Sequence, residues 1–247
     1  MILAILQARV SSTRLPGKVL APILGQPMII RQIERVMRSS MIDKLVVATS
    51  SDQSDDALVS EFERHDISGL EVRRGSLDDV VARFGSVIDE FDPTTIVRLT
   101  ADCPLADVDV IDTVIRSHLA SAKDYTSNTI HPTYPDGLDV EALTADAWRR
   151  LMEIPLTPRE REHVTLGLYG RTDEFTINSV TQLHDRSAMR WTVDVPDDLT
   201  FVRSVYDKLY HGDPEFGQEA IVELLRAHPD LNRTERDLAR NAALASE

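Results

Sequence analysis

Residues 1–18, MILAILQARVSSTRLPGK, join an apolar segment to a cationic one. Residues 2–6 (ILAIL) have the continuous aliphatic character of a buried strand. Serine, proline and glycine follow, and these residues favour a loop or a tight turn over a longer strand. The sequence therefore predicts a buried strand that ends in a loop carrying Arg9, Arg14 and Lys18.

Three later segments share the apolar character of residues 2–6. They are KLVVAT (44–49), LEVRR (70–74) and TIVRLT (95–100). Segments with the apolar spacing of amphipathic helices occur at residues 28–37, 55–62 and 78–91. This alternation predicts an α/β fold with a predominantly parallel central sheet flanked by helices. Because such sheets bind ligands beyond the carboxyl ends of their strands, residues 7–18 and 100–105 are expected on one rim.

The second half of the chain has a less regular pattern. Strands are expected at residues 125–129, 138–143, 174–180 and 189–195. Helices are expected at residues 144–152, 158–170, 196–210 and 217–227, followed by a charged helix or frayed tail at 233–247. No repeat or low-complexity linker divides the sequence, so we expect a single domain over residues 1–247.

The composition narrows the possible functions. With 41 acidic and 27 basic residues among 247, the formal net charge is −14, which disfavours binding to nucleic acid and to anionic membranes. No segment approaches the ~20 apolar residues that span a bilayer, and the N-terminus has no signal-peptide pattern. The single cysteine, Cys103, rules out an intramolecular disulfide. We therefore expect a cytoplasmic protein with no nucleic-acid or membrane partner.

The loop at residues 7–18 has the chemistry of a polyphosphate site. Its backbone amides can converge on phosphate oxygens while Arg9, Arg14 and Lys18 neutralise their charge. The Walker pattern GxxxxGK[ST] and the dinucleotide pattern GxGxxG are both absent from this segment. A surface turn with solvated cations would explain the same residues, but the position on the rim of the sheet favours anion binding.

Two aspartates stand at expected strand ends, each two residues before a proline. Asp102 ends RLTAD (98–102), and Asp194 lies in MRWTVDVP (189–196). Carboxylates in these positions could hold Mg²⁺ against phosphates, or they could simply cap a turn or a helix. Cys103 is interpreted as a buried structural thiol. The acidic residues expected to cap or decorate helices are Asp107, Asp109, Asp112, Asp197 and Asp198.

Three further motifs could bind other parts of a substrate. In RRGSLDDVVARF (73–84), Arg74 and Ser76 could contact a base or ribose, or Ser76 could cap a helix on whose surface Arg83 forms an ion pair. The polar residues of YPDGLDVEAL (134–143) and REREHVTLGLY (159–169) could hydrogen-bond a polyhydroxy acceptor, although the second motif could equally be a solvated helix face. The acceptor candidates are Asp136, Gly137, Asp139, Glu141, Glu162 and His163.

The segment QARVSSTRLPGKVLAPILGQPMI (7–29) resembles the opening of the sugar-acid cytidylyltransferases. It is similar to the 3-deoxy-manno-octulosonate (Kdo) and acylneuraminate enzymes, and more similar to the SpsF-like proteins of spore-coat polysaccharide biosynthesis. The other motifs follow in the family's order, so the resemblance covers residues 1–205. It implies a Rossmann-like nucleotide-diphospho-sugar transferase fold. The implied parts are a nucleotide-binding half (1–120), an acceptor and dimerisation half (121–205) and C-terminal helices (206–247).

The resemblance also implies a nucleotide site, because in the family the loop at residues 7–18 wraps the triphosphate of CTP. The family usually has glycine at the position of Ser11, which makes that residue the first place to look for a different loop shape. The implied nucleotide-binding residues are Ala8, Arg9, Ser11, Ser12, Thr13, Arg14, Lys18, Arg74, Ser76 and Thr100.

The activity implied by the family is Mg²⁺-dependent transfer of CMP from CTP to a small anionic acceptor, a sugar acid for surface polysaccharide, with release of pyrophosphate. Asp102 and Asp194 would be the metal ligands and, with Arg14 and Lys18, the catalytic residues. A phosphonate or another non-sugar acceptor, a different nucleotide base, and a catalytically silent nucleotide-binding protein are alternatives. Relatives often form dimers, so a homodimer that uses residues 120–180 is expected.

Overall fold

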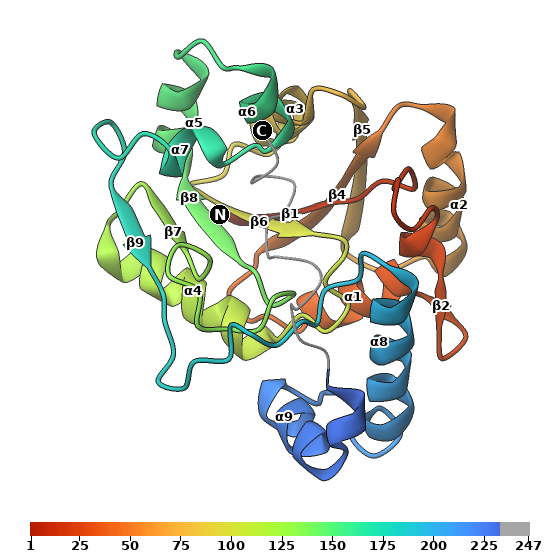
Figure 1. Ribbon diagram of the computed structural model, residues 1–247. Helices are drawn as coiled ribbons and strands as arrows, with labels where there is room; N and C mark the ends of the chain where they lie inside the picture. The colour runs from red at the N-terminus through yellow and green to blue at the C-terminus, as the bar shows by residue number, and fades with distance from the viewer. Residues whose placement is uncertain (233–247) are drawn as a thin grey trace.

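The computed structural model describes residues 1–232 (Figure 1), and the helix or tail expected at 233–247 lies outside them. Within the described residues, seven strands form one sheet in the order β5-β4-β1-β6-β8-β7-β9. These strands are β1 (Ile2–Gln7), β4 (Lys44–Ser50), β5 (Leu70–Gly75), β6 (Thr95–Thr100), β7 (Tyr125–Ser127), β8 (Glu141–Thr144) and β9 (Ile177–Ser179). The short strands β2 (Pro22–Ile23) and β3 (Gln26–Pro27) pair separately.

The central sheet is mostly parallel, as the sequence predicts. β4 and β6 flank β1 in parallel, with Leu3 opposite Lys44 and Ile2 opposite Thr95, and β5 pairs in parallel with β4. β8 is the exception, because it runs antiparallel to both β6 and β7, while β9 is parallel to β7. Since parallel strands end at the same edge, the segments that follow β1, β4 and β6 meet on one rim.

The helices of the described chain match most of the predicted ones, with ends shifted by a few residues. Three short 3₁₀ helices are η1 (Lys18–Leu20), η2 (Gln53–Asp55) and η3 (Pro229–Leu231). The α-helices are α1 (Met28–Val36), α2 (Asp56–His65), α3 (Val80–Phe91), α4 (Val108–Ser121), α5 (Ala145–Met152), α6 (Pro158–Glu162), α7 (Leu166–Tyr169), α8 (Pro196–Leu209) and α9 (Gln218–Ala227). Across residues 1–232, none of them is both long and apolar enough to cross a membrane.

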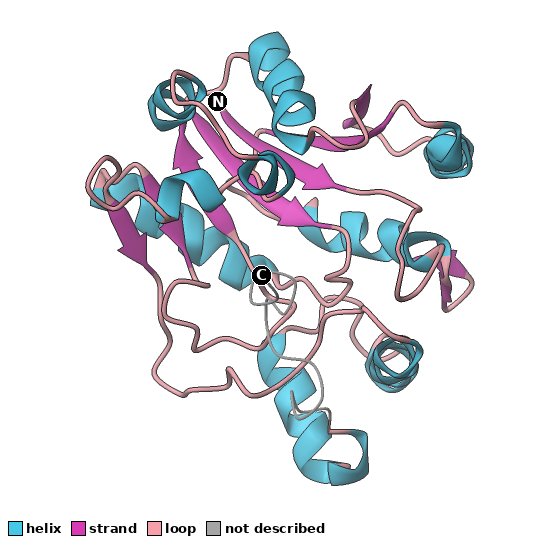
Figure 2. Ribbon diagram, turned by 45° about the horizontal axis from the view of Figure 1, so that its top comes forward, coloured by secondary structure: helices cyan, strands magenta, loops and turns pink. Residues whose placement is uncertain are grey.

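Helices cover both faces of the sheet (Figure 2), and β1 shows why. Successive side chains of a strand point to opposite faces. Ala4 and Leu6 pack in an apolar cluster that includes residues of α1, α4, α8 and α9, whereas Leu3 and Ile5 pack in a second cluster with residues of α3 and α5. All four side chains are fully buried, so a continuous apolar strand is needed to supply both faces at once.

The strand expected at residues 189–195 is absent from the sheet, and that prediction is wrong. Its backbone hydrogen bonds go to two loops instead of to a neighbouring strand. Asp136 N donates to Met189 O (2.9 Å), Trp191 N donates to Asp136 O (2.7 Å), and Val193 N donates to Asp102 O (2.8 Å). The apolar side chains of this segment are therefore buried without belonging to a sheet strand, and Asp194 lies inside the segment instead of at a strand end.

Other expected elements are shorter than predicted, and the strands expected at 125–129 and 174–180 span only Tyr125–Ser127 and Ile177–Ser179. The helix expected at 158–170 divides into α6 and α7, because Val164 between them has φ 25°, which no helix accommodates. The side chain of Val164 is buried in the same apolar cluster as residues of α3 and α5, so the break between the two helices places this side chain in the core. The strand expected from residue 138 begins only at Glu141, since Leu138 and Val140 bond to Asn128 through its side-chain amide.

Candidate active site

A cavity of about 550 Å³ opens beside the carboxyl end of β6. From the predicted nucleotide and metal sites, Arg14, Thr100, Asp102 and Asp194 line it. From the predicted acceptor site, Asp136, Asp139, Glu141 and His163 line it. Residues that are far apart in the sequence thus share one cavity at the rim of the sheet.

The cationic loop begins directly after β1. Gly17 has φ +73°, and its amide donates to the carbonyl of Val10 at 3.1 Å, which closes the loop before Lys18. Ala8 is buried, whereas Arg9, Ser11, Thr13 and Arg14 are exposed and Ser12 is partly exposed. Ser12 also accepts a hydrogen bond from Leu15 N at 3.3 Å. The glycine that the loop needs for its backbone is therefore Gly17. Ser11 does not have a positive φ.

A buried carboxylate that sequence reasoning missed anchors this loop. Asp55 is fully buried, and its Oδ1 accepts from Val10 N at 2.6 Å. Its Oδ2 accepts from the amide of Ser50 at 3.1 Å and from the Ser50 hydroxyl. Asp55 thus ties the loop after β1 to the end of β4. Its sequence context, SDQSDD, looks like an ordinary helix start.

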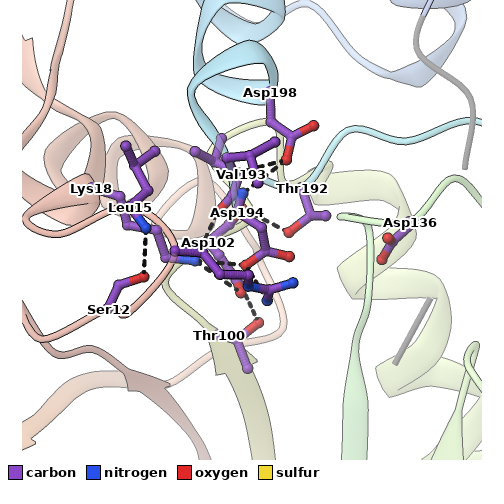
Figure 3. A network of polar contacts seen from close by, with 12 residues as sticks. Ser12, Leu15, Lys18, Thr100, Asp102, Asp136, Thr192, Val193, Asp194 and Asp198 are labelled. Atoms are coloured by element: carbon purple, nitrogen blue, oxygen red, sulfur yellow. Dashed lines mark hydrogen bonds and ion pairs between the residues drawn. The ribbon is translucent and has the colours of Figure 1, made fainter. Parts of the chain in front are cut away.

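Lys18 lies between the two predicted metal ligands (Figure 3). Its Nζ is 3.0 Å from Asp194 Oδ1 and 3.5 Å from Asp102 Oδ2, and it donates to the carbonyl of Val193 at 2.7 Å. Arg14 Nη2 reaches the same oxygen of Asp194 at 2.9 Å. Arg14 and Lys18, two of the three cations of the loop, therefore meet the carboxylates at one place.

Two residues close in sequence hold the other oxygen of Asp102. Asp102 Oδ1 accepts from the Thr100 hydroxyl at 2.7 Å and from Cys103 Sγ at 3.4 Å. Burial alone raises the pKa of Asp102, but the charge of Lys18 and the Thr100 hydrogen bond outweigh it and hold the pKa below its ordinary value. Burial, with the charge of Asp102, raises the pKa of Cys103 well above the usual range, as suits a structural thiol.

The donor set fits a divalent cation that is shared with substrate phosphates. Asp102 Oδ2 and Asp194 Oδ1 both face Lys18 Nζ, so these two carboxylate oxygens lie on the same side of the site. Within residues 1–232 no group of three or more His, Cys, Asp or Glu side chains could hold a metal by itself. Mg²⁺ commonly binds one or two carboxylates and completes its shell with phosphates and water. Asp102 and Asp194 are therefore suited to Mg²⁺, provided that a ligand supplies the remaining oxygens.

Sequence reasoning also missed Arg190, which lines the cavity. Its guanidinium donates to Asp136 Oδ2 (3.0 Å), Asp194 Oδ2 (3.0 Å) and both oxygens of Asp198 (3.1 and 3.2 Å). Burial alone lowers the pKa of Arg190, but Asp198 and the other carboxylates more than compensate and raise it. Asp198 also accepts from the amides of Asp194 and Val195, so the predicted role of Asp198 at the start of α8 is confirmed.

The wall predicted to bind the acceptor is a network of hydrogen bonds. Glu141 Oε1 accepts from the Tyr125 hydroxyl at 2.7 Å and from the Thr165 hydroxyl at 2.8 Å, and its Oε2 pairs with Arg98. Arg98 Nη2 also donates to Gln7 Oε1 at 3.3 Å. The Arg98–Glu141 ion pair, the Thr165 hydroxyl and the nearby His163 ring thus offer several hydrogen-bonding groups to one side of the cavity.

His163 and Glu162 have different surroundings although they are adjacent. His163 lines the cavity, and burial lowers its pKa, as do the charges of Arg98, Arg159 and Arg9 against an opposing effect of Glu162. The imidazole is therefore favoured in its neutral form, which can donate one hydrogen bond and accept another. Glu162 is exposed at the end of α6, as expected of a solvated helix face.

Gly137 allows two cavity segments to approach closely. Its φ is +107°, and a Cβ atom there would lie 2.5 Å from Thr192 N and 2.6 Å from Trp191 C. Asp136 and Arg190 form an isolated parallel bridge at the same place. The predicted acceptor residue Gly137 therefore has a structural reason to be glycine.

The motif at residues 73–84 is arranged differently from the prediction. Asp79, not Ser76, caps α3 by accepting from Ala82 N at 2.8 Å, and the Ser76 hydroxyl accepts from Asp79 N. Arg83 is buried rather than on the surface, because its guanidinium donates to the carbonyl of Ser76 and its stem covers Gly75. Arg74 donates to the carbonyls of Ser50 and Asp52, which places it beside the end of β4.

The other caps agree with the sequence. Asp107 is the N-cap of α4, since its Oδ1 accepts from the amides of Asp109 and Val110. Its Oδ2 accepts from Gln218 N, which ties the start of α9 to α4. Asp112, by contrast, bonds to the hydroxyls of Ser39 and Ser40 after α1.

Comparisons with known proteins support the family that the motifs indicate. The chain is 33% identical over 244 residues to the spore coat polysaccharide biosynthesis protein SpsF of Bacillus subtilis, which covers 96% of this chain and 98% of that protein. A cytidylyltransferase structure from Leptospira borgpetersenii matches with a TM-score of 0.87 and 28% identity, covering 93% of this chain and 95% of that one.

A second solved structure shows the shared fold at lower identity. CMP:2-keto-3-deoxy-manno-octonic acid synthetase complexed with CTP matches with a TM-score of 0.64 and 18% identity, over 84% of this chain and 98% of that one. The predicted Rossmann-like nucleotidyltransferase fold is thus confirmed. Residues 3–209 match the family described as cytidylyltransferase, and with the SpsF likeness this shows that the chain belongs to the cytidylyltransferases, a family of nucleotidyltransferase enzymes.

Proposed function

We propose that this enzyme transfers CMP from CTP to a hydroxyl of a small anionic acceptor, a sugar acid, and releases pyrophosphate. The observation that carries this proposal is the meeting of Arg14 and Lys18 with Asp102 and Asp194 at the edge of one cavity. Cations suit the phosphates, and carboxylates suit the metal that phosphates bring with them. The likeness to SpsF supports a place in polysaccharide biosynthesis.

The nucleotide is proposed to bind along the loop after β1. Arg9, Arg14 and Lys18 would neutralise the triphosphate, with loop amides and hydroxyls as further donors. The likeness to the synthetase complexed with CTP supports this nucleotide. The proposed set also includes Ala8, Ser11, Ser12, Thr13, Arg74, Ser76 and Thr100.

Asp102 and Asp194 are proposed to hold Mg²⁺ through the two oxygens that face Lys18. When bound there, the ion would neutralise phosphate charge and orient the α-phosphate. Thr100 and Cys103 hold the opposite oxygen of Asp102, which leaves its second oxygen directed toward the site. Arg14 and Lys18 also contact Asp194, so both cations are close enough to exchange this carboxylate for a phosphate oxygen when the nucleotide binds.

The proposed reaction is an in-line displacement at the α-phosphorus of CTP. The acceptor hydroxyl oxygen forms a bond to the α-phosphorus while the bond to the bridging oxygen of the β-phosphate breaks. Pyrophosphate leaves with that electron pair, and Arg14 and Lys18 stabilise its charge. The hydroxyl proton passes to water or to a cavity carboxylate, so no dedicated protein base is required.

The acceptor is proposed to occupy the side of the cavity formed by Asp136, Asp139, Glu141 and His163. Carboxylates accept hydrogen bonds from sugar hydroxyls, and the neutral imidazole can either donate or accept. Gly137 shapes this wall through the close approach of residues 191–192. Glu162 is exposed and could contact only the part of an acceptor that extends toward α6.

Pyrophosphate release tests the proposal directly. The enzyme is incubated with Mg²⁺, a panel of sugar acids and each of CTP, UTP, GTP and ATP. CTP with at least one sugar acid is expected to give the fastest release. Asp102→Asn should reduce release to background while the protein still folds and unfolds cooperatively, whereas Asp109→Asn, on the exposed first turn of α4, should be active. Near-normal transfer by Asp102→Asn would exclude the metal assignment.

A homodimer is proposed for the second half of the chain, as in related enzymes. The expected interface segment, residues 120–180, contains the edge strand β9, and an edge strand can pair with a second copy of the chain. Leu183 follows β9 and is 93% exposed. Light scattering of the purified protein should give twice the mass of one chain, and Leu183→Asp should lower it. A monomeric parent protein would exclude the dimer.

A further inference from the structure

Arg190 joins two walls of the cavity through one buried guanidinium. Its side chain is 3% exposed and donates to carboxylates from two distant segments, Asp136 on one side and Asp194 with Asp198 on the other. The three carboxylates share the positive charge of one guanidinium, so the loss of Arg190 would affect all three at once. The fork of an arginine can serve several acceptors at fixed angles, which a lysine cannot do.

The contacts divide the two oxygens of Asp194 between different partners. Oδ2 accepts from Arg190 Nη2 at 3.0 Å, whereas Oδ1 faces Lys18 Nζ at 3.0 Å and Arg14 Nη2 at 2.9 Å. The backbone amide of Asp194 donates to Asp198, which Arg190 also holds. Arg190 thus holds the Asp194 carboxylate directly, and through Asp198 it also helps to hold the backbone of Asp194 in place.

The second arm of Arg190 reaches the proposed acceptor wall. Nη1 donates to Asp136 Oδ2 at 3.0 Å, and the backbones of the two residues bridge in parallel. Trp191 N donates to Asp136 O at 2.7 Å, and the missing side chain of Gly137 allows this approach. Asp194 and Asp136 are therefore linked by one guanidinium and by a close backbone contact.

We propose that Arg190 is a positioning residue that directs Asp194 toward metal-bound CTP and couples it to the acceptor wall at Asp136. This inference rests on the proposed function, because it takes Asp194 as a metal ligand. Arg190 itself touches carboxylates rather than the reacting atoms. Its loss should thus weaken metal and acceptor binding while leaving the chemistry recoverable at high Mg²⁺ concentration.

The test uses Arg190→Lys and Arg190→Gln in the full chain. Thermal unfolding is followed at a fixed CTP concentration while Mg²⁺ is increased, and pyrophosphate release is followed in parallel. Groups that orient a metal ligand usually change metal affinity by about 10–100-fold. We expect the half-saturating Mg²⁺ concentration in both measurements to rise by about 10-fold or more. Turnover should recover at saturating Mg²⁺, and the KM for the acceptor should rise.

A purely structural role would give a different pattern. It would lower the unfolding temperature equally with and without Mg²⁺ and would leave the half-saturating Mg²⁺ concentration unchanged, which would overturn the proposal. Arg186→Lys is the matched control, since Arg186 forms a bidentate pair with Glu219 and its side chain is only 9% exposed. It is expected to leave the Mg²⁺ dependence unchanged.

A second variant decides the question if the Arg190 variants do not fold. Asp198→Asn removes a charge that holds Arg190 but can still accept from the amides of Asp194 and Val195. The proposal expects the same increase in half-saturating Mg²⁺, and an unchanged value would overturn it. If the parent enzyme gains no stability from CTP at any Mg²⁺ concentration, the proposed function fails instead.

Discussion

The Nζ atom of Lys18 lies 3.0 Å from Oδ1 of Asp194, although 176 positions separate the two residues in the sequence. Lys18 also approaches Asp102 Oδ2 at 3.5 Å, so one ammonium faces both predicted metal ligands. The side chain of Lys18 is 11% exposed, which limits the screening of its charge by water. Lys18 can thus balance the two carboxylates and remain within reach of a phosphate bound beside them.

Lys18→Met is expected to lower pyrophosphate release by about 10²–10³-fold. The reason is the loss of a preorganised charge at the leaving group, whose removal commonly costs that much in turnover. The measurement is the steady-state rate with CTP, Mg²⁺ and an active acceptor. Lys44→Met is the control, because Lys44 pairs with Glu71 and is the first residue of β4, at the strand end away from the active-site rim. A Lys18→Met enzyme within a few-fold of the parent would show that Lys18 is not needed for the reaction.

Gly137→Ala is expected to destabilise the protein and damage the acceptor wall together. The positive φ of +107° is unfavourable for alanine, and the new Cβ would lie 2.5 Å from Thr192 N. Strain of this kind costs about 1–3 kcal/mol of the free energy of unfolding, before the clash is added. Urea denaturation measures the loss, and the KM for the acceptor should rise. Gly212→Ala, where the nearest atom to a Cβ is 3.7 Å away, should stay within about 0.5 kcal/mol.

Ser11→Gly should have little effect on turnover, although the family resemblance leads us to expect glycine there. Ser11 is exposed and its backbone does not have a positive φ, so serine meets no steric penalty. Glycine would increase the entropy of the unfolded chain and lower the free energy of unfolding by about 0.4–1 kcal/mol. Urea denaturation and the pyrophosphate assay check both parts. A large gain in turnover would mean that Ser11 distorts the loop.

Sequence reasoning found the parts of the site whose signal is local. Lys18 belongs to a compact motif after a buried strand, and Asp102 lies two residues after the end of another, so the parallel order of β1 and β6 brings them together. Arg190 and Asp55 gave no comparable signal. Arg190 contacts Asp194 only four positions away, but its link to Asp136 spans 54 positions, and the link from Asp55 to Val10 spans 45. No local pattern encodes these two distant contacts.

The errors have a related physical origin. Alternating apolar residues at 189–195 are typical of a strand, but here the polar Arg190 and Thr192 are buried along with Trp191 and Val193. The backbone partners are the loops at Asp136 and Asp102, which the pattern does not specify. Similarly, Ser76 and Asp79 are both good N-cap residues, and Asp79 is the cap because α3 begins at Val80. Local propensity thus located these segments but not their partners.

His118 should make the protein less stable below neutral pH. It is buried on α4, and its Nδ1 lies 3.0 Å from the Thr126 hydroxyl in β7. Burial lowers its pKa, with a smaller opposing effect of Asp124. As the pH falls through the ordinary histidine value of about 6.5, the unfolded chain takes up the proton before the folded one does. The stability contributed by the neutral ring is therefore present above this pH and is lost below it.

His118→Gln keeps a hydrogen-bonding group but removes the titration, so the free energy of unfolding should fall less steeply between about pH 7 and pH 5. Urea denaturation at several pH values measures this slope. Thr126→Val is the matched control, because it removes the hydrogen-bond partner and leaves the imidazole buried. That variant should be less stable at every pH and retain the slope of the parent. Equal slopes for His118→Gln and the parent would show that another group causes the acid sensitivity.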